Sequence, residues 1–259
     1  NWTFPEPGQK VIHLDIDPED LNRVFRTEVC LPGDARTVLE QLIEETKNAA
    51  QPDRGPWLKL VKEMKDAWQE LKNKEQQSAK QPILPQRVMK AIQSVLDDDT
   101  CIVADASFAS AWVAEHLEFD KAGRRCLFPR GSAGLGWSLP AAIGVAASGK
   151  FKKVIVVAGD GGYGYSVNEL ATLRQHGYPI VSVVLNNSTW GWMKWLGQMT
   201  YEKEPVSTDL VDINFAAVSE GFGLPGIHVT DPARLEESLV SVLDSGKGGV
   251  LNVVTAWDE

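Results

Sequence analysis

The sequence predicts an α/β fold, in which a doubly wound parallel sheet carries helices on both faces. From residue 83 onward, short apolar runs such as those at 154–158 and 180–185 alternate with longer amphipathic segments. Strands that are apolar along their whole length are typical of a parallel sheet buried on both faces, with helices as the crossovers. With 259 residues, 43% of them hydrophobic, the chain can form one large domain and part of another.

The elements of the large domain follow from hydrophobic periodicity and from the turn residues between the runs. Helices are predicted at 85–96, 107–117, 139–148 and 167–176, with further helices near 213–221 and 232–245. Strands are predicted at 101–104, 126–129, 154–158, 180–185 and 250–255, with another around Ile227. Ligands of such sheets bind outside the carboxyl ends of the strands, where the strand order reverses. The turn after 154–158 is therefore expected to hold a ligand.

Composition divides the chain into three regions, 1–50, 51–82 and 83–259. The first holds a predicted strand at 10–17 and a helix with Asp34 near its N-cap, and neither element can bury its apolar face alone. It looks like the tail of a domain whose remainder lies elsewhere. The second is rich in charge, Gln and Lys, so we expect a docked helix followed by a polar connector. An apolar stripe at helical spacing is expected to pack this helix: Trp57, Leu60, Val61, Met64 and Trp68.

Charge and residue usage exclude several classes of protein. A formal net charge of -9 leaves no basic face for general nucleic-acid binding. No apolar stretch approaches the roughly 20 residues that span a membrane, and the start does not resemble a secretory signal. Cys30, Cys101 and Cys126 show no metal or redox spacing and fit buried thiols in a reducing compartment, so we expect a cytoplasmic protein. The four histidines form no H-x-x-x-H pair, which gives a histidine metal site no support.

The glycine-rich turn in VIVVAGDGGYG (154–164) fits two motifs. Gly159, Gly161 and Gly164 match the G-x-G-x-x-G of dinucleotide-binding turns. That motif requires an acidic residue about 20 positions later, at the end of the next strand, and here that strand ends in two asparagines. Asp160 would also face a pyrophosphate of like charge, which costs on the order of kcal/mol. The dinucleotide interpretation therefore fits poorly.

A divalent cation removes this conflict. Asp160 supplies one oxygen, Asn187 a second and neutral one, and a diphosphate two more, which is how Mg²⁺ is usually held. Gly161 and Gly162 lack Cβ atoms, so their backbone N–H groups can approach the phosphates. The segment SVNE (166–169) is interpreted as a capping box that points the positive end of the next helix at the anion. The sequence thus predicts a metal-bridged diphosphate site.

Three segments resemble a known family. GDGGYGYSVNELATLRQHGYPIVSVVLNN (159–187) is similar to the thiamin-diphosphate motif, which runs from G-D-G to N-N across a βαβ unit. RGSAGLGWSLPAAIG (130–144) resembles the G-x-x-x-x-G-x-x-L-P-A-A-I-G segment of the acetolactate synthase, benzoylformate decarboxylase and glyoxylate carboligase group. KVIHLDIDPEDLNR (10–23) with the later GDAR resembles the end of that group's central domain. The resemblance implies the thiamin-diphosphate-binding fold, preceded by a fragment of the central domain.

The resemblance also implies which residues bind the cofactor and its metal. Mg²⁺ would be held by Asp160, Asn187 and the backbone carbonyl of Thr189. Ala133 would offer its carbonyl to the aminopyrimidine, and Leu135 would be the apolar wedge that bends the cofactor, the alternative being an ordinary core leucine. The complete set of implied cofactor residues is Ser107, Phe108, Ala109, Ala133, Leu135, Gly159, Asp160, Gly161, Gly162 and Asn187.

Trp192, Met193 and Leu196 are implied to line the substrate pocket. The alternative is that the aromatic residues of STWGWMKWLGQM (188–199) pack a helix against the sheet. Acetolactate synthases usually carry Trp at the position of Leu196 and Met at that of Trp192. This departure argues against a standard acetolactate synthase.

The resemblance places the activating glutamate of the family in a separate pyrimidine-binding domain, so no catalytic residue is expected in this chain. Glu169 would be a capping residue. We expect the diphosphate-binding subunit or half of a thiamin-diphosphate- and Mg²⁺-dependent lyase or carboligase, acting on small 2-oxo acids or 2-hydroxyacyl substrates within a homo- or hetero-oligomer. The alternatives are a decarboxylase without ligation, a non-catalytic cofactor-binding homologue and a Rossmann-type oxidoreductase.

Overall fold

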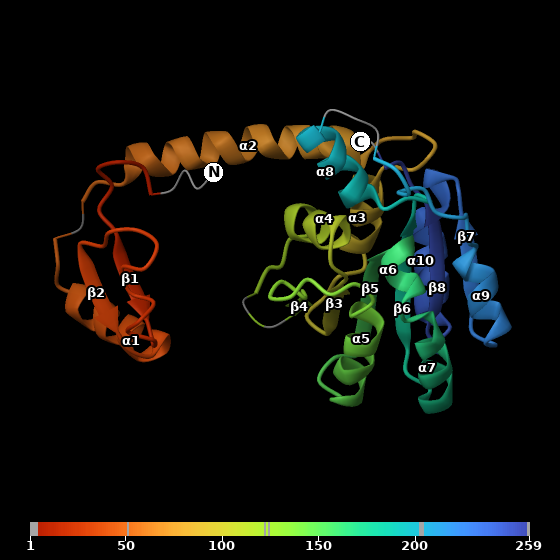
Figure 1. Cartoon of the computed structure of the whole chain (residues 1–259). Coiled ribbons are helices and arrows are strands. Elements are labelled where there is room, and N and C mark those ends of the chain that lie inside the picture. Colours follow the sequence, from red (N-terminus) through yellow and green to blue (C-terminus); the bar gives the residue numbers. More distant parts are fainter. Residues whose placement is uncertain (1–4, 51, 122, 124, 202–204, 258–259) are drawn as a thin grey trace. The chain divides into compact units, whose positions relative to one another are not determined.

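A computed structural model describes residues 5–50, 52–121, 123, 125–201 and 205–257 (Figure 1). The chain forms two compact units, Asn1–Glu63 and Met64–Glu259. The boundary lies within one helix, and the three-part division at residues 50 and 82 stays a prediction. No described helix is long and apolar enough to cross a membrane.

The first unit contains a small parallel pair of strands. β1 (Ile12–Asp15) pairs with β2 (Val29–Pro32), and α1 (Ala35–Thr46) follows. Asp34 caps α1 as predicted, because its side chain accepts a hydrogen bond from the Thr37 N–H at 3.0 Å. β2, which is four residues long, was not predicted from the sequence. α1 contains no buried residue, which agrees with the expectation that this region cannot bury its own apolar faces.

α2 (Gly55–Gln76) lies in the region where a docked helix followed by a polar connector was predicted. The helix is present, but its apolar stripe is exposed and not docked as expected: Trp57 is 64% exposed and Trp68 is 43% exposed. Leu60, Val61 and Met64 are exposed as well. Helical periodicity specified a helix, but it carried no information about which surface would cover the stripe.

The second unit is built on a six-stranded parallel sheet, which confirms the predicted fold class. The strand order is β4-β3-β5-β6-β8-β7, and every neighbouring pair is parallel. The strands are β3 (Thr100–Ala104), β4 (Cys126–Leu127), β5 (Lys153–Gly159), β6 (Ile180–Asn186), β7 (Gly226–Val229) and β8 (Gly249–Val254). The helices are α3 (Pro85–Gln93), α4 (Phe108–His116), α5 (Ser138–Ala147), α6 (Asp160–Gly164), α7 (Leu170–His176), α8 (Gly191–Tyr201), α9 (Phe215–Gly221) and α10 (Leu235–Asp244), with 3-10 turns η1 (Val167–Glu169) and η2 (Pro232–Arg234).

Helices cover both faces of the sheet (Figure 1). Alternate strand residues enter opposite cores, as the two-residue period of a strand requires: Ile155 and Val157 pack with α3, α4 and α10, whereas Val154 and Val156 pack with α5, α6 and α7. Both cores are formed from residues with almost no exposed surface. This continuous burial explains why the strands appear in the sequence as unbroken apolar runs.

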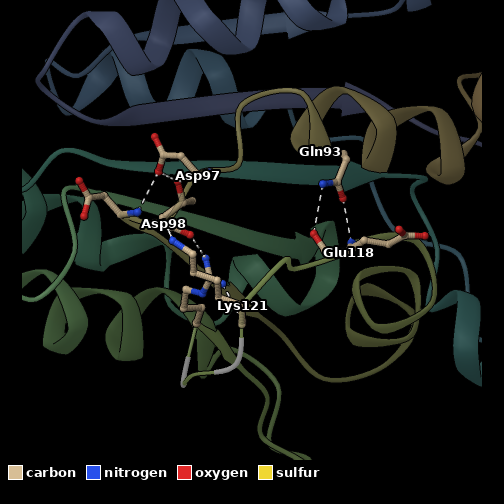
Figure 2. Close-up of polar contacts among 8 residues, drawn as sticks. Gln93, Asp97, Asp98, Glu118 and Lys121 are labelled. Carbon is tan, nitrogen blue, oxygen red and sulfur yellow. Dashed lines mark hydrogen bonds and ion pairs between the residues drawn. The ribbon is translucent and has the colours of Figure 1, made fainter.

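Polar contacts fasten the amino ends of the strands, as Figure 2 shows. Asp97 precedes β3 and accepts hydrogen bonds from Thr100 Oγ1 and from Lys153 Nζ of β5, both at 2.6 Å. The side chain of Gln93 accepts from the Glu118 N–H at 2.8 Å and donates to the carbonyl of the same residue at 3.2 Å, which joins the ends of α3 and α4. These contacts secure one edge of the sheet and leave the carboxyl edge for a ligand.

We expect the Arg87→Met substitution to destabilise the second unit. Arg87 donates to both carboxylate oxygens of Glu236, at 2.7 and 2.8 Å, and to the Pro232 carbonyl at 3.0 Å, which ties α3 to α10. Its side chain is only 13% exposed, so removing it leaves polar partners unsatisfied. The free energy of unfolding in urea should fall by about 1–3 kcal/mol.

Lys152→Met is the matched control, because Lys152 pairs with Asp99 on the exposed surface. Surface ion pairs contribute little, so this variant should unfold like the unmodified chain. Equal urea midpoints for Arg87→Met and Lys152→Met would contradict a structural role for the partly buried Arg87–Glu236 pair.

Candidate cofactor-binding site

Three neighbouring strand ends meet at one edge of the sheet. β3, β5 and β6 are adjacent and parallel, so the segments after Ala104, Gly159 and Asn186 begin at the same edge. The chain leaves β3 toward β4 on one side, whereas β5 lies on the other side, so the strand order reverses between β3 and β5. A crevice is expected at such a point. The predicted ligand position after 154–158 lies there.

Asp160 is a buried carboxylate with an unused oxygen atom. The residue is 6% exposed and lies in the first turn of α6, directly after β5. Its Oδ2 atom has no hydrogen-bond partner in the described part of the chain. Burial raises the pKa of Asp160 from 3.8 to about 6, and hydrogen bonds from the backbone N–H groups of Gly161 and Ser188 offset part of that rise. A buried carboxylate oxygen without a partner is costly, and a bound cation would supply one.

The glycine turn is helical from its first residue. β5 passes straight into α6, with Gly159 as the N-cap. The first N–H groups of a helix have no intrahelical acceptor, so this end is positive and polar. Gly161 uses its N–H on the Asp160 carboxylate. A Cβ on Gly161 would lie 2.5 Å from the ring of Trp190, so glycine is required with the ring in this position. The sequence analysis did not single out Trp190.

The capping box predicted at 166–169 is wrong. Ser166 is the N-cap of η1, but its side chain makes no capping bond, and its hydroxyl has no partner among the described residues. Glu169 accepts a hydrogen bond from Thr172 Oγ1 at 2.8 Å instead. Because α6 already occupies the segment after β5, the helix end at the crevice belongs to α6 and not to α7.

The two asparagines after β6 have different surroundings. Asn186 is 2% exposed, and its Nδ2 donates to Asp212 Oδ1 at 3.1 Å, which anchors the turn. Asn187 is half-buried, and its Oδ1 accepts from the Thr189 N–H at 3.2 Å. The Thr189 carbonyl accepts from the Gly191 N–H at 2.9 Å. Asn187 and Thr189 line the same cavity as Asp160.

The turn after β3 has a strained backbone. Ser107 has φ 74° and ψ −150°, a region that is essentially restricted to glycine. Its carbonyl accepts from Ser110 Oγ at 2.9 Å, within the first turn of α4. Phe108 begins α4 and meets Trp192 edge to face at 5.1 Å between ring centroids, and it stacks on Trp112 at 5.9 Å. Phe108 thus joins the turn to α8.

Asp105 is a site residue that the sequence analysis missed. It is 1% exposed, and its Oδ2 accepts from the Gly136 N–H at 3.1 Å and from Ser138 Oγ at 2.9 Å. Burial raises its pKa, and these hydrogen bonds oppose the rise. An acid directly after a buried strand is the same signal that identified Asp160, so it could have been found. Asp105 fixes the loop that carries Ala133 and Leu135.

That loop brings small and apolar residues to the crevice. Ala133 has φ 50°, another left-handed position next to the cavity. Gly136 has φ 76°, and a Cβ on it would lie 2.6 Å from the Cβ of Tyr165, so only glycine fits. Leu135 is 41% exposed and lines the cavity, which argues against an ordinary core leucine. Its Cδ2 lies 3.6 Å from where a Cβ on Gly162 would be.

α8 supplies the aromatic wall. Trp192 is 39% exposed, Met193 is 56% exposed, and both line the cavity. Leu196 is 41% exposed but is not among the residues that line it. The aromatic residues do form a helix, as the packing alternative expected, and that helix also faces the cavity.

The cavity has a volume of about 610 Å³, within the usual range for a small-molecule site. Most of the predicted site residues line it together: Ser107, Phe108, Ala109, Ala133, Leu135, Gly159, Asp160, Gly161, Gly162, Asn187, Thr189, Trp192 and Met193. Other lining residues that the sequence analysis did not identify include Trp190, Arg130 and Trp257.

The donor set suits a hard cation shared with a ligand. Within the described ranges, no three or more His, Cys, Asp or Glu side chains form a group that could hold a metal by themselves. One carboxylate, one amide oxygen and one backbone carbonyl would leave several positions to phosphate oxygens and water, which is the way Mg²⁺ is commonly bound. The unpartnered Oδ2 of Asp160 is the observation on which this fit rests.

A parallel sheet with a glycine turn, a buried acid and an apolar cavity at its switch point defines a cofactor-binding enzyme domain. Comparison with known proteins identifies the family: residues 105–253 match the one described as thiamine pyrophosphate enzyme, C-terminal TPP binding domain. The chain belongs to this family of thiamine pyrophosphate (thiamin diphosphate) enzymes. The match confirms the resemblance of the motifs and shows thiamin diphosphate as the cofactor of the domain.

Similar curated proteins are large subunits of acetolactate synthase. The isozyme 3 large subunit of Escherichia coli is 30% identical over 250 residues, which cover 92% of this chain and 42% of that protein. The probable large subunit of Methanocaldococcus jannaschii is 28% identical, covering 96% and 42% respectively, and that of Lactococcus lactis is 29% identical, covering 88% and 39%. The chain thus spans about two fifths of the length of the curated relatives it matches.

We expect Ser107→Gly to stabilise the protein. The backbone of Ser107 lies in a region that only glycine occupies without strain, and its side chain makes no capping hydrogen bond. Urea denaturation should show a free energy of unfolding that is higher by about 1 kcal/mol. Ser148→Gly is the control, because Ser148 has ordinary right-handed angles, and there glycine should destabilise. A loss of stability in Ser107→Gly similar to that in Ser148→Gly would contradict the strain.

Asp160 should make the metal-free protein less stable as the pH rises. Its pKa is about 6 in the folded state and near 3.8 when exposed, so the folded state holds the proton more tightly. This stabilisation is complete below a pH of about 4 and is lost as the pH rises through 6.

In metal-free buffer, Asp160→Asn is therefore expected to raise the free energy of unfolding by about 1–3 kcal/mol at pH 8 and to change little at pH 4. Urea unfolding at the two pH values measures the difference. An equal effect at both would show that Asp160 is not destabilised by its charge.

Proposed function

We propose that this chain is the diphosphate- and metal-binding half of a thiamin-diphosphate- and Mg²⁺-dependent lyase or carboligase that acts on small 2-oxo acids or 2-hydroxyacyl substrates. The pyrimidine-binding domain would come from another chain or another part of the enzyme. The acetolactate synthase names of the relatives support carbon–carbon bond formation, and they describe proteins more than twice as long.

The observation that carries the proposal is the buried, unpartnered oxygen of Asp160 at the switch point of the sheet. Asp160 Oδ2, Asn187 Oδ1 and the Thr189 carbonyl would hold Mg²⁺, while the diphosphate would lie against the first turn of α6 near Gly162. A dinucleotide site would instead require an acid at the end of β6, where Asn186 and Asn187 lie. The glycines therefore support a metal-bridged diphosphate.

When bound, thiamin diphosphate supplies the carbanion-stabilising chemistry of the reaction. The residues of this chain hold and shield it. Ala133 would accept a hydrogen bond from the aminopyrimidine through its carbonyl, and Leu135 would fill the space beneath the bent cofactor. Phe108, Trp192 and Met193 form an apolar wall that would exclude water from the reacting carbon.

The activating acid would come from outside the described residues. Glu169 is engaged with Thr172 in η1 and is not among the residues that line the cavity, so it is a poor candidate. A pyrimidine-binding domain that supplies a glutamate would complete the site and would require a stable dimer or higher oligomer. The three cysteines are free thiols, which supports a reducing compartment such as the cytoplasm.

Thiamin diphosphate is expected to bind in a metal-dependent manner. Four tryptophans line the cavity, so binding should quench tryptophan fluorescence. Adding EDTA removes the metal, and substituting Asp160→Ala removes the carboxylate that is proposed to hold it. Either change leaves the charge of the diphosphate without a bound cation and should weaken the affinity by about 100-fold or more. Asp244→Ala removes an exposed acid outside the cavity and should leave the affinity unchanged.

Two results would contradict the proposal. One is thiamin diphosphate binding that survives both EDTA and Asp160→Ala. The other is release of CO₂ from pyruvate by the 259-residue chain with thiamin diphosphate and Mg²⁺ alone, because the account assigns the activating acid to a second domain.

A further inference from the structure

The described lining of the cavity contains one positively charged side chain, that of Arg130. Among its described lining residues Asp160 is the acid and Arg130 the base, and the others are apolar or neutral. Asp160 is assigned to the metal, and none of the proposed cofactor contacts uses Arg130, which is exposed. An arginine in an otherwise apolar ligand cavity is a specificity feature, because few polar groups orient the ligands of such sites.

Arg130 is positioned by the turn that lines the same cavity. Its Nη1 donates to Ser110 Oγ at 3.0 Å, and that hydroxyl donates to the Ser107 carbonyl at 2.9 Å. The hydrogen bonds connect the guanidinium to the strained turn after β3. Arg130 begins the loop that continues to Ala133 and Leu135.

The charge of Arg130 is not neutralised within the described residues. Arg87 is paired with Glu236 and Arg125 with Asp98, whereas Arg130 has no carboxylate within ion-pair distance in the described part of the chain. One guanidinium hydrogen bond goes to a neutral hydroxyl, and the remaining donors can serve a ligand. A guanidinium binds a carboxylate with two parallel hydrogen bonds.

We propose that Arg130 binds a substrate carboxylate that is retained in the product, an inference that rests on the proposed function. Decarboxylation breaks the bond to a carboxylate, leaves the electron pair on the adjoining carbon and releases neutral CO₂. A cation holding the departing carboxylate would stabilise the ground state more than the transition state and slow the reaction. Arg130 therefore holds the carboxylate of the second 2-oxo acid, whose carbonyl carbon is attacked and whose carboxylate remains.

Binding of a non-reactive probe tests the carboxylate assignment. The chain is loaded with thiamin diphosphate and Mg²⁺ and titrated with oxamate and with its neutral isostere oxamide, with binding followed by tryptophan fluorescence. Oxamate is expected to bind more tightly, and Arg130→Met to weaken oxamate by about 10- to 100-fold without changing oxamide. Arg130→Lys should recover part of the affinity. Arg234→Met removes an exposed arginine outside the cavity and serves as the control for net charge.

The outcomes separate this inference from the proposed function. If the unmodified protein does not bind thiamin diphosphate, that result contradicts the proposed function itself. Normal cofactor binding with no saturable oxamate binding, or with oxamate binding that Arg130→Met leaves unchanged, would overturn only the inference. Inorganic phosphate is titrated in parallel, and an Arg130-dependent affinity for phosphate but not for oxamate would show a phosphate subsite and overturn the carboxylate assignment.

Product partition tests which carboxylate is held. In the holoenzyme assembled with its pyrimidine-binding domain, Arg130→Met should keep CO₂ release from pyruvate within about threefold and lower the fraction of ligated product at least about tenfold. An equal fall in both would show that Arg130 holds the departing carboxylate or acts only structurally.

Discussion

The site depends on one buried oxygen of Asp160, Oδ2, which has no hydrogen-bond partner among the described residues. The carboxylate lies where β5 becomes α6, and burial raises its pKa to about 6. Backbone N–H groups of Gly161 and Ser188 stabilise the ionised form only in part. In the metal-free protein this arrangement costs stability, and in the proposed holoenzyme the same unsatisfied oxygen would be a metal ligand.

The surrounding residues make this arrangement possible. Asp105 holds the Gly136 loop beside the first turn of α6, and Gly136 and Gly161 allow contacts that a Cβ would block. Ser107 and Ala133 adopt left-handed backbone angles next to the same cavity, and such strain persists only where the surrounding structure fixes it. The polar contacts at the amino edge and the two buried cores supply that rigidity, so the carboxyl edge can be specialised for binding.

Local patterns in the sequence predicted the parallel sheet and its helices, and the resemblance to a known family implied most of the residues that line the cavity. Unbroken apolar runs specify buried strands, and the glycines, Asp160 and the paired asparagines follow strands directly. The analysis failed where the outcome depends on tertiary context. The capping box predicted at 166–169 does not form, because α6 already occupies the segment directly after β5. The apolar stripe containing Trp57 and Trp68 is exposed, and Leu196 on α8 does not line the cavity. Arg130 and Trp190 were missed because their roles arise from segments distant in the sequence.

The most direct test of the central claim is to locate the metal. Crystals of the chain grown with thiamin diphosphate and Mn²⁺ in place of Mg²⁺, measured at the manganese absorption edge, would show the ion by its anomalous signal. The account predicts a single peak bound by Asp160 Oδ2, Asn187 Oδ1 and the Thr189 carbonyl, with diphosphate oxygens completing the shell. Bound cofactor with the manganese elsewhere, or with no manganese next to Asp160, would contradict it.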